Sequence, residues 1–385
     1  MNSSLQEHCR RELEGLDSKG LRRRLRCGVS QGTRLFRFDG RVLVNFSSND
    51  YLGLASDPRL WAGVEGGAAE VGNMGAGASR LVSGNHPDYM TLEAELARFK
   101  QVDEVLVFGS GYAAAVGTIP ALVGKEDFVV MDKLCHASLV DGARLSGAVI
   151  RVYPHLNMDR CGELLANCRE KAGDEGKILL VTESVFSMDG DLAPLDQLAQ
   201  LKDQYGAWLM VDEAHGSGVL GREGRGGTEM FCVEDRVDVA MGTLSKAFGC
   251  VGGFVGGKSG LKDHLVNRAR SLIYSTGLPS VVCRAACRAV RMVREEPVLR
   301  ERLWVNIRKM AEGLGVPPVS PIFPVIIPDE KTCVETSLRL AEAGFWAPAI
   351  RYPTVPRGKA RLRISVSAAH TAGDVQGLLE ALRLR

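Results

Sequence analysis

Residues 208–216 read WLMVDEAHG, and residues 237–249 read VDVAMGTLSKAFG. In each stretch a short apolar run of strand length ends in polar residues, which are Asp212 and His215 in the first and Lys246 in the second. Ligands of a parallel sheet bind beyond the carboxyl ends of its strands. We therefore expect these side chains to meet at one edge of a sheet, where a desolvated lysine amine would be a nucleophile.

The same alternation of apolar runs and amphipathic segments extends along the chain. Runs typical of buried strands lie at 43–46, 105–108, 128–131, 149–152, 178–182, 208–211, 237–241 and 251–256. Segments with helical apolar spacing lie between most of them, for example at 92–99, 113–122 and 195–205. Buried strands alternating with helices predict an α/β fold with a mostly parallel central sheet and helices on both faces.

The two ends of the chain have a different pattern. Residues 5–26 predict a charged amphipathic helix. After Pro279 a charged helical stretch at 280–313 is followed by strand-like runs at 322–327 and 361–366 and by helical runs near 334–343 and 374–384. We divide the chain into an N-terminal helical segment at 1–44, a large α/β domain at 45–278 and a smaller α+β domain at 279–385.

The overall composition excludes several classes of partner. Lys and Arg number 48 and Asp and Glu 46, so we expect neither nucleic acid nor a membrane as a partner. The first residues have no apolar signal core, and the ten cysteines include no CxxC pair and no zinc spacing. These features predict a cytoplasmic protein without a metal site. The basic run LRRRLR at 21–26 fits a solvated helix face and an anion site equally well.

A phosphate-loop pattern at residues 252–259, GGFVGGKS, is interpreted as a chance match. The phosphate loop needs a strand before the glycines and a helix that begins at the lysine. Here the apolar pair Phe254-Val255 inside the pattern looks like the strand itself. The pair Gly109 and Gly111 also lacks the third glycine of a dinucleotide fingerprint.

An acid after one strand and a lysine after the next is the pair that pyridoxal phosphate (PLP) requires. The acid keeps the pyridine nitrogen protonated, and the lysine forms an imine with the aldehyde. Asp212 alone would be a helix cap about half the time. His136, which opens a helix after a strand, would more often be a cap or packing residue than a ligand group. Ser110-Gly111-Tyr112 opens another helix, whose free amides favour a phosphate.

The chain resembles the α-oxoamine synthases, which are fold-type-I PLP enzymes, from about Arg22 to Ala369. The motifs that carry this resemblance are NFSSNDYLGL at 45–54, GASRLVSG at 77–84, VTESVFSMDG at 181–190, VDEAHG at 211–216, TLSKAFG at 243–249, YSTG at 274–277 and IRYPTVPRGKARLR at 350–363. The resemblance implies a PLP-dependent acyltransferase of that fold, assembled as a homodimer with shared active sites.

The resemblance also implies the roles of particular residues. Lys246 corresponds to the imine lysine that removes the substrate's α proton, Asp212 to the acid at the pyridine nitrogen, and His136 to the residue that stacks on the ring. Further implied cofactor contacts are Gly111, Tyr112, Ser187, His215, Thr243 and, from the neighbouring subunit, Thr276. Implied substrate contacts are Asn49, Arg351 for the amino acid carboxylate, and Thr354 and Arg22 for the acyl chain. Arg23 and Arg24 adjoin Arg22, so that register is open.

Chain length and the stretch Arg361–His370 favour the branch that condenses L-alanine with a pimeloyl thioester of CoA or of a carrier protein. The alternatives are the glycine-using branches, 2-amino-3-ketobutyrate CoA ligase and 5-aminolevulinate synthase, then a PLP aminotransferase, and finally a non-catalytic subunit. Two residues depart from the family pattern. Tyr89 replaces a frequent histidine, and Cys135 precedes His136 where serine or asparagine is usual.

Overall fold

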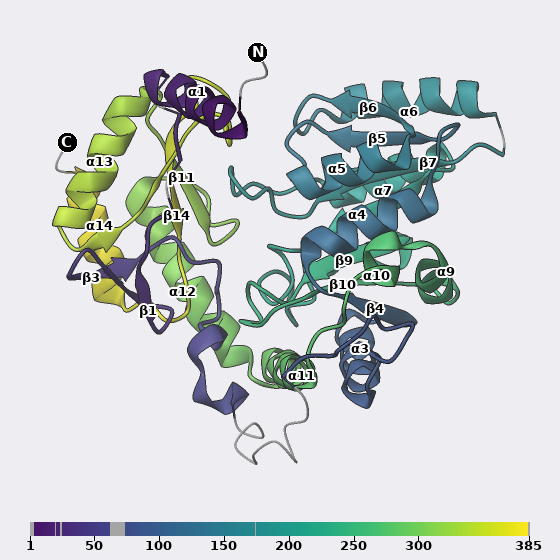
Figure 1. The fold of residues 1–385 in the computed structure, drawn as a ribbon, viewed down its shortest axis with the longest axis horizontal. Coiled ribbons are helices and arrows are strands. Elements are labelled where there is room, and N and C mark those ends of the chain that lie inside the picture. The colour runs from purple at the N-terminus through teal and green to yellow at the C-terminus, as the bar shows by residue number, and fades with distance from the viewer. Residues whose placement is uncertain (1–3, 20, 24, 62–73, 174, 384–385) are drawn as a thin grey trace.

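The computed structural model describes residues 4–19, 21–23, 25–61, 74–173 and 175–383. Its larger part is an α/β unit, and its smaller part contains both the first strands and the last helices of the chain (Figure 1). Helices α11 (Ser280–Glu295) and α12 (Pro297–Leu314) connect the two parts. Within the described residues, every helix is too short or too polar to cross a membrane.

The centre of the larger part is a seven-stranded sheet with the order β4-β10-β9-β8-β7-β5-β6. All neighbouring strands are parallel except β10, which is antiparallel to both β4 and β9. The strands are β4 (Glu104–Phe108), β5 (Phe128–Asp132), β6 (Val149–Tyr153), β7 (Ile178–Glu183), β8 (Trp208–Asp212), β9 (Val239–Thr243) and β10 (Gly253–Gly257). The mostly parallel sheet predicted from the apolar runs is confirmed. Strand β10 also runs through the phosphate-loop pattern, as its apolar pair indicated.

Side chains of the central sheet are buried on both faces, because successive residues of a strand point in opposite directions. In β7, Leu179 and Val181 pack into one apolar cluster, while Ile178 and Leu180 pack into another. The first cluster includes α4 (Gly111–Leu122), α5 (Ala137–Ser146), α9 (Leu261–Arg268) and α10 (Arg270–Ile273). The second includes α6 (Met158–Ala172) and α7 (Leu195–Gln204). The two apolar clusters therefore cover the two faces of the sheet.

The smaller part combines both ends of the chain. Strands β1 (Val29–Gln31), β2 (Leu35–Phe38) and β3 (Arg41–Asn45) share a sheet with β12 (Phe345–Trp346), which pairs parallel to β3. A second sheet has the order β11-β14-β13, from Ile322–Ile326, Arg361–Ser365 and Ala349–Ile350. Helices α13 (Glu330–Glu342) and α14 (Ala372–Arg383) complete this part. The predicted C-terminal α+β character is therefore present, although the boundaries at 45 and 279 stay a prediction.

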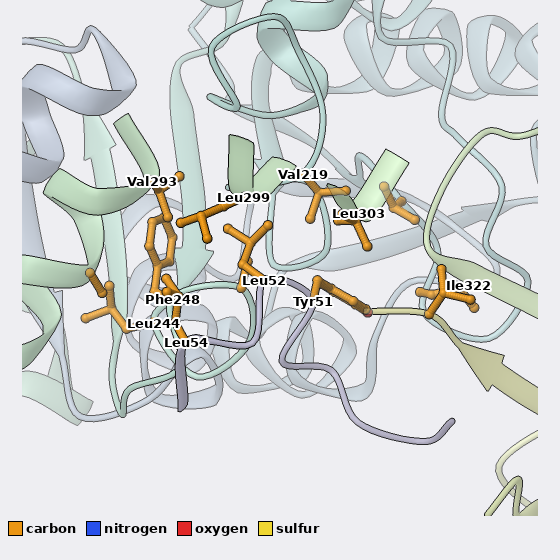
Figure 2. Close-up of a cluster of buried hydrophobic side chains, with 14 of the residues drawn as sticks. Tyr51, Leu52, Leu54, Val219, Leu244, Phe248, Val293, Leu299, Leu303 and Ile322 are labelled. Atoms are coloured by element: carbon orange, nitrogen blue, oxygen red, sulfur yellow. The ribbon is translucent and has the colours of Figure 1, made fainter. Parts of the chain in front are cut away.

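A third apolar cluster packs the two parts together. It includes residues of the loop after β3, of α3 (Pro87–Lys100), and of α11, α12 and α14. Figure 2 shows its centre, where Leu52 lies between Phe248, which follows β9, and Tyr51. Leu303 of α12 and Ile322 of β11 approach from the smaller part. This cluster fixes the loop after β3 beside the carboxyl ends of the central strands.

The helix at the N-terminus is shorter than the one predicted at residues 5–26. Helix α1 covers Leu5–Ser18 and ends well before Arg26, and strands β1 and β2 lie inside the 1–44 segment predicted to be helical, whereas β3 confirms the strand predicted at 43–46. Arginines at 22, 23, 24 and 26 repel one another at helical spacing, which disfavours continuation of the helix. The aromatic alternation around Phe36 and Phe38 instead suits a strand.

A partly buried ion pair joins the turn before β2 to the last helix. Arg34 donates two hydrogen bonds of 2.7 Å from Nε and Nη2 to Asp374, which is 7% exposed. Asp374 also accepts bonds from the backbone N–H and the hydroxyl of Thr371. Burial raises the pKa of Asp374, but the bonds from Arg34 and Thr371 outweigh burial and lower it to about 2.

We expect Asp374→Asn to lower the free energy of unfolding at neutral pH by about 1–3 kcal/mol, because it removes a charge-assisted pair. The carboxylate pKa is depressed in the folded state, so its contribution is complete above the unfolded pKa of about 4 and is lost as the pH falls toward about 2. Urea unfolding of both proteins across this range measures the difference. Glu163→Gln, which breaks the exposed pair with Arg160, is the control and should change stability by less than about 0.5 kcal/mol. A difference between wild type and Asp374→Asn that stays constant down to pH 2 would contradict the assignment.

Candidate active site

Lys246 lies three residues beyond the end of β9, at the open edge of the central sheet. Its Nζ is 2.9 Å from Nε2 of His215, which follows β8. Burial lowers the pKa of the Lys246 amine, while the nearby carboxyls of Asp212 and Glu183 act in the opposite direction. A lysine whose ammonium is destabilised in this way supplies the neutral amine that attacks a carbonyl.

Two carboxyl groups lie close enough to Lys246 to affect the pKa of its amine. Asp212 ends β8, Glu183 ends β7, and the two residues are direct partners in the parallel register. Both are almost fully buried, and burial raises the pKa of each. Asp212 accepts a 2.8 Å bond from the Ala214 N–H on Oδ1, but none of the described residues donates to Oδ2. That buried oxygen fits a ligand with a cationic N–H, such as a protonated pyridine.

His136 begins α5 from the neighbouring strand end. Its Nδ1 accepts a 3.2 Å bond from the Ser138 N–H. The side chain therefore caps the helix, which is the more frequent role of a histidine at such a position. Its own backbone N–H donates to Glu183. The imidazole nevertheless remains exposed, so capping leaves a ring face available to a flat ligand. Glu183 thus connects the two residues, Asp212 and His136, that the sequence assigned to the ring.

The groups predicted to hold a phosphate lie at the start of α4 and after β9. Ser110 caps α4, with its hydroxyl accepting a 3.0 Å bond from the Ala113 N–H. A side chain added at Gly111 would meet Cβ of Thr243 at 3.4 Å, so these two residues are in contact. The Thr243 hydroxyl also lies 2.7 Å from that of Ser245. A helix N-terminus beside two hydroxyls is a favourable position for an anion.

Three other predicted cofactor residues have different surroundings. The backbone C=O of Ser187 accepts a 2.6 Å bond from Nε of Arg363. Tyr112 is exposed and donates to Asp141. Thr276 is also exposed, and it forms an isolated antiparallel bridge with Ser79.

Arg363 of β14 is a residue that sequence reasoning did not assign to the site. It is 7% exposed, and its Nη1 donates to Oδ1 of Asn49 at 3.0 Å. No acidic side chain of the described residues lies within ion-pair distance of its guanidinium, yet its charge lowers the pKa of Lys246 and His215. A buried arginine with only neutral partners suits an incoming carboxylate. The alternation RLRIS places Arg361 and Arg363 on one face of the strand, but Arg361 pairs with Asp189 at 2.7 Å. Only the contacts distinguish the two arginines.

The remaining predicted substrate residues surround two cavities. A basic cavity of about 850 Å³ is lined by Arg22, Arg23, Arg26 and Arg351 together with apolar side chains. Arg22 pairs with Asp17 at 2.6 Å, whereas Arg23 donates a 3.2 Å bond to the Thr354 hydroxyl. The structure therefore brings Arg23 into contact with Thr354, whereas the arginine that binds the acyl chain stays a prediction. Arg24 lies outside the described residues.

Thr354 also lines the second cavity, which has a volume of about 720 Å³ and reaches Cys135, the neighbour of His136. The Cys135 thiol is buried there and donates to the Val181 C=O. Tyr89, the other departure from the family pattern, is buried, and its hydroxyl accepts from the Leu278 N–H. Cys135 therefore borders the cavity, and Tyr89 belongs to the apolar core.

Comparison with known proteins identifies the class of fold and site. Residues 41–382 match the family model described as aminotransferase class I and II. An 8-amino-7-oxononanoate synthase of Anaeromyxobacter dehalogenans is 47% identical over 378 residues, covering 96% of this chain and 93% of the relative. A serine palmitoyltransferase from S. paucimobilis with a bound PLP–myriocin aldimine superposes with a TM-score of 0.91 at 28% identity, covering 99% and 98% of the two chains. The 8-amino-7-oxononanoate synthase of Francisella tularensis superposes with a TM-score of 0.75 at 29% identity, covering 88% of this chain and 96% of that one.

The chain belongs to the aminotransferase class I and II family of PLP-dependent enzymes. Within that family its relatives are α-oxoamine synthases, and those reported above include two proteins named 8-amino-7-oxononanoate synthase. The fold type, the PLP cofactor and the enzyme class expected from the sequence are confirmed. The residues at the strand ends also fit the cofactor, because a buried acid, a lysine of lowered pKa and an anion-binding helix start lie together.

We expect Lys246 to be the lysine that binds PLP covalently. Lys246→Ala should lose the visible colour that borohydride fixes to the protein, and it should turn over no substrate, because Lys246 is the lysine that lies beside His215 and close to the carboxyls of Asp212 and Glu183. Lys258→Ala is the control, since Lys258 follows β10 within the chance phosphate-loop pattern. Peptide mass spectrometry of the reduced holoenzyme locates the label. A label on another lysine would contradict this assignment.

Proposed function

We propose that this protein condenses L-alanine with a pimeloyl thioester and releases carbon dioxide, the free thiol and 8-amino-7-oxononanoate, a step of biotin synthesis. The observation that carries this proposal is the 47% identity to an 8-amino-7-oxononanoate synthase over nearly the whole of both chains. The acid, the lysine and the histidine that such chemistry needs are present and adjacent at the strand ends.

Each residue around Lys246 has its own role in the proposed reaction. When bound, PLP supplies a ring that accepts the electron pair released as a bond to the α carbon breaks. Lys246 would remove the α proton of alanine, because burial favours its neutral amine at this edge of the sheet. With PLP bound, Asp212 would keep the pyridine nitrogen protonated through its free oxygen, and His136 would contact the ring. His215 would bind the ring oxygen, and Gly111, Tyr112, Ser187, Thr243 and Thr276 would hold the rest of the cofactor.

We assign the alanine carboxylate to Arg363 with Asn49. Sequence resemblance pointed to Arg351, but that residue lines the basic cavity beside Arg22 and Arg23. Arg363 supports the role better, because it is buried and contacts Asn49, and because its charge adds to burial in lowering the pKa of Lys246. A guanidinium in the same site as the reactive amine can orient the α carbon toward it.

The acyl donor fits the two cavities on either side of the loop that carries Thr354. The distal carboxylate of a pimeloyl chain needs a cation once it leaves water. Arg23, in contact with Thr354, offers that cation, and Arg22 and Arg351 line the same cavity. The second cavity leads from Thr354 to Cys135, next to His136, so it provides a path to the reacting centre.

The substrate pair is tested by a product assay over alanine and glycine against pimeloyl, succinyl and acetyl thioesters, each as CoA and as carrier-protein ester. We expect alanine with a pimeloyl donor to give the highest kcat/KM. The preference for alanine rests on one methyl group, worth about 1–3 kcal/mol, so some turnover of glycine is expected. Equal turnover of glycine with succinyl-CoA or acetyl-CoA would move the protein to a glycine-using branch.

The same product assay distinguishes the proposed roles of Arg363, Arg23 and Arg22. Arg363→Lys should raise the KM for alanine at least tenfold, because a lysine cannot keep the two-pronged geometry. Arg23→Ala should weaken the pimeloyl donor and leave an acetyl donor unaffected, whereas Arg22→Ala should have the smaller effect. The proposed assignments would be reversed if Arg351→Ala weakened alanine and Arg363→Lys did not.

We also propose a homodimer with shared active sites. Thr276 belongs to a segment whose neighbours Tyr274, Leu81 and Val82 are exposed apolar side chains, and Thr276 bridges to Ser79 between them. Apolar side chains gathered around a predicted phosphate contact support a partner subunit at this surface.

Co-expression of differently tagged Lys246→Ala and Thr276→Ala subunits tests the shared site. Each hybrid should contain one intact site and one with both defects, so hybrids should have about half of the wild-type activity, while each parent variant is impaired. Light scattering gives the assembly state of wild type. A fully active monomer would exclude the shared site.

A further inference from the structure

A continuous line of close polar contacts connects Lys246 to Arg363. Nζ of Lys246 is 2.9 Å from Nε2 of His215, and Nδ1 of His215 is 2.6 Å from the hydroxyl of Tyr51. The Tyr51 hydroxyl is 3.2 Å from Oδ1 of Asn49, which also accepts the 3.0 Å bond from Arg363. Tyr51 is the central member of this line, and the function proposed above gives it no role.

Tyr51 is fixed by packing as well as by its hydroxyl. It has no exposed surface, and its ring lies in the apolar cluster that joins the two parts of the molecule. In Figure 2 the ring lies between Leu52 and Ile322, below Leu303. A tyrosine held in this way presents its hydroxyl in one position, because a buried ring has no room to change rotamer.

The number of hydrogens in the line is limited. Burial, and then the charge of Lys246, keep the pKa of His215 well below its usual value, so the imidazole is neutral and has one N–H. Burial raises the pKa of Tyr51, so the phenol keeps its single hydrogen. Asn49 Oδ1 can only accept, and Arg363 already donates to it.

The single hydrogen of Tyr51 therefore has two competing acceptors. Nδ1 of His215 is the nearer one, at 2.6 Å against 3.2 Å for Asn49 Oδ1, and the arginine already satisfies that oxygen. If the hydroxyl donates to Nδ1, the imidazole hydrogen must be on Nε2, which faces Lys246. His215 then becomes a hydrogen-bond donor toward the cofactor side of the site.

We propose that Tyr51 is a positioning residue that acts through His215, by fixing the tautomer in which Nε2–H points toward Lys246 and the cofactor ring oxygen. The charged and titratable groups that face His215 are Lys246, Arg363 and His136. These groups are basic, so they disfavour a second proton on the imidazole. The imidazole thus stays neutral, and Tyr51 determines which of its two nitrogens carries the hydrogen.

Tyr51→Phe tests the proposal in the PLP-loaded enzyme. Losing the hydroxyl should weaken donation from Nε2 to the ring oxygen, so the imine proton should be held more tightly. The pH midpoint of the visible absorption should then rise by about 0.5–1 unit, and kcat should fall roughly tenfold. Tyr153→Phe is the matched control, because Tyr153 is also fully buried and its hydroxyl has no partner among the described residues. It should leave the midpoint unchanged.

A second background tests whether Tyr51 works through His215. In His215→Gln enzyme the Tyr51→Phe shift of the midpoint should disappear, because the group that transmits it is gone. An equal shift in both backgrounds would overturn the proposal, as would an unchanged midpoint in a Tyr51→Phe enzyme with a native circular dichroism spectrum.

A direct measurement on the unaltered protein remains decisive if Tyr51→Phe does not fold. Nitrogen-15 spectra of histidine-labelled holoenzyme, with the His215 signals assigned by their loss in His215→Gln, report which nitrogen carries the hydrogen. We expect Nε2 protonated and Nδ1 unprotonated. The opposite pattern would show that Tyr51 donates to Asn49 and does not set the tautomer.

Discussion

The constraint on which this site depends is the burial of charge at the ends of β7 and β8. Glu183 and Asp212 lie side by side in the register of a parallel sheet, where apolar layers cover both faces. Carboxyl groups removed from water are costly unless cations or N–H groups compensate them. Lys246 compensates them in part, and a protonated pyridine would complete the compensation. Cofactor binding should therefore contribute to the stability of this edge of the sheet as well as to catalysis.

The site is assembled from both parts of the molecule. The acid, the lysine and the two histidines follow strands of the central sheet, whereas Arg363 comes from a strand of the smaller part. The loop with Asn49 and Tyr51 lies between them, fixed by the apolar cluster of Figure 2. The distance between Arg363, the arginine that we assign to the carboxylate, and the reactive amine thus depends on packing far from either group, so a cavity in that cluster would disturb catalysis without touching a reacting residue.

The positions of most strands along the chain and the main chemical groups could be predicted from the sequence because both have local signals. Buried strands are apolar runs, and Asp212 and Lys246 follow two of them directly. Arg363 could not be found in this way, because its neighbour Arg361 has the same burial pattern and differs only in its partner, Asp189. The contact between Arg23 and Thr354 spans 331 positions, so no local pattern could distinguish Arg23 from Arg22. The two leucines at 21 and 25 have helical spacing, so the sequence predicts a helix that is longer than α1.

The sheet that joins both ends of the chain has a consequence for synthesis. Strand β3 ends at Asn45, and its partner β12 begins at Phe345, which is 300 residues later. At translation rates of about 5–20 residues per second, the first strands wait roughly 15–60 seconds for this partner. During that time β3 has an unpaired edge while the central sheet can already form. The ribosome-bound intermediate should therefore have a folded central sheet and an aggregation-prone strand edge near its amino terminus. Chaperones that cover this edge would be most useful late in translation.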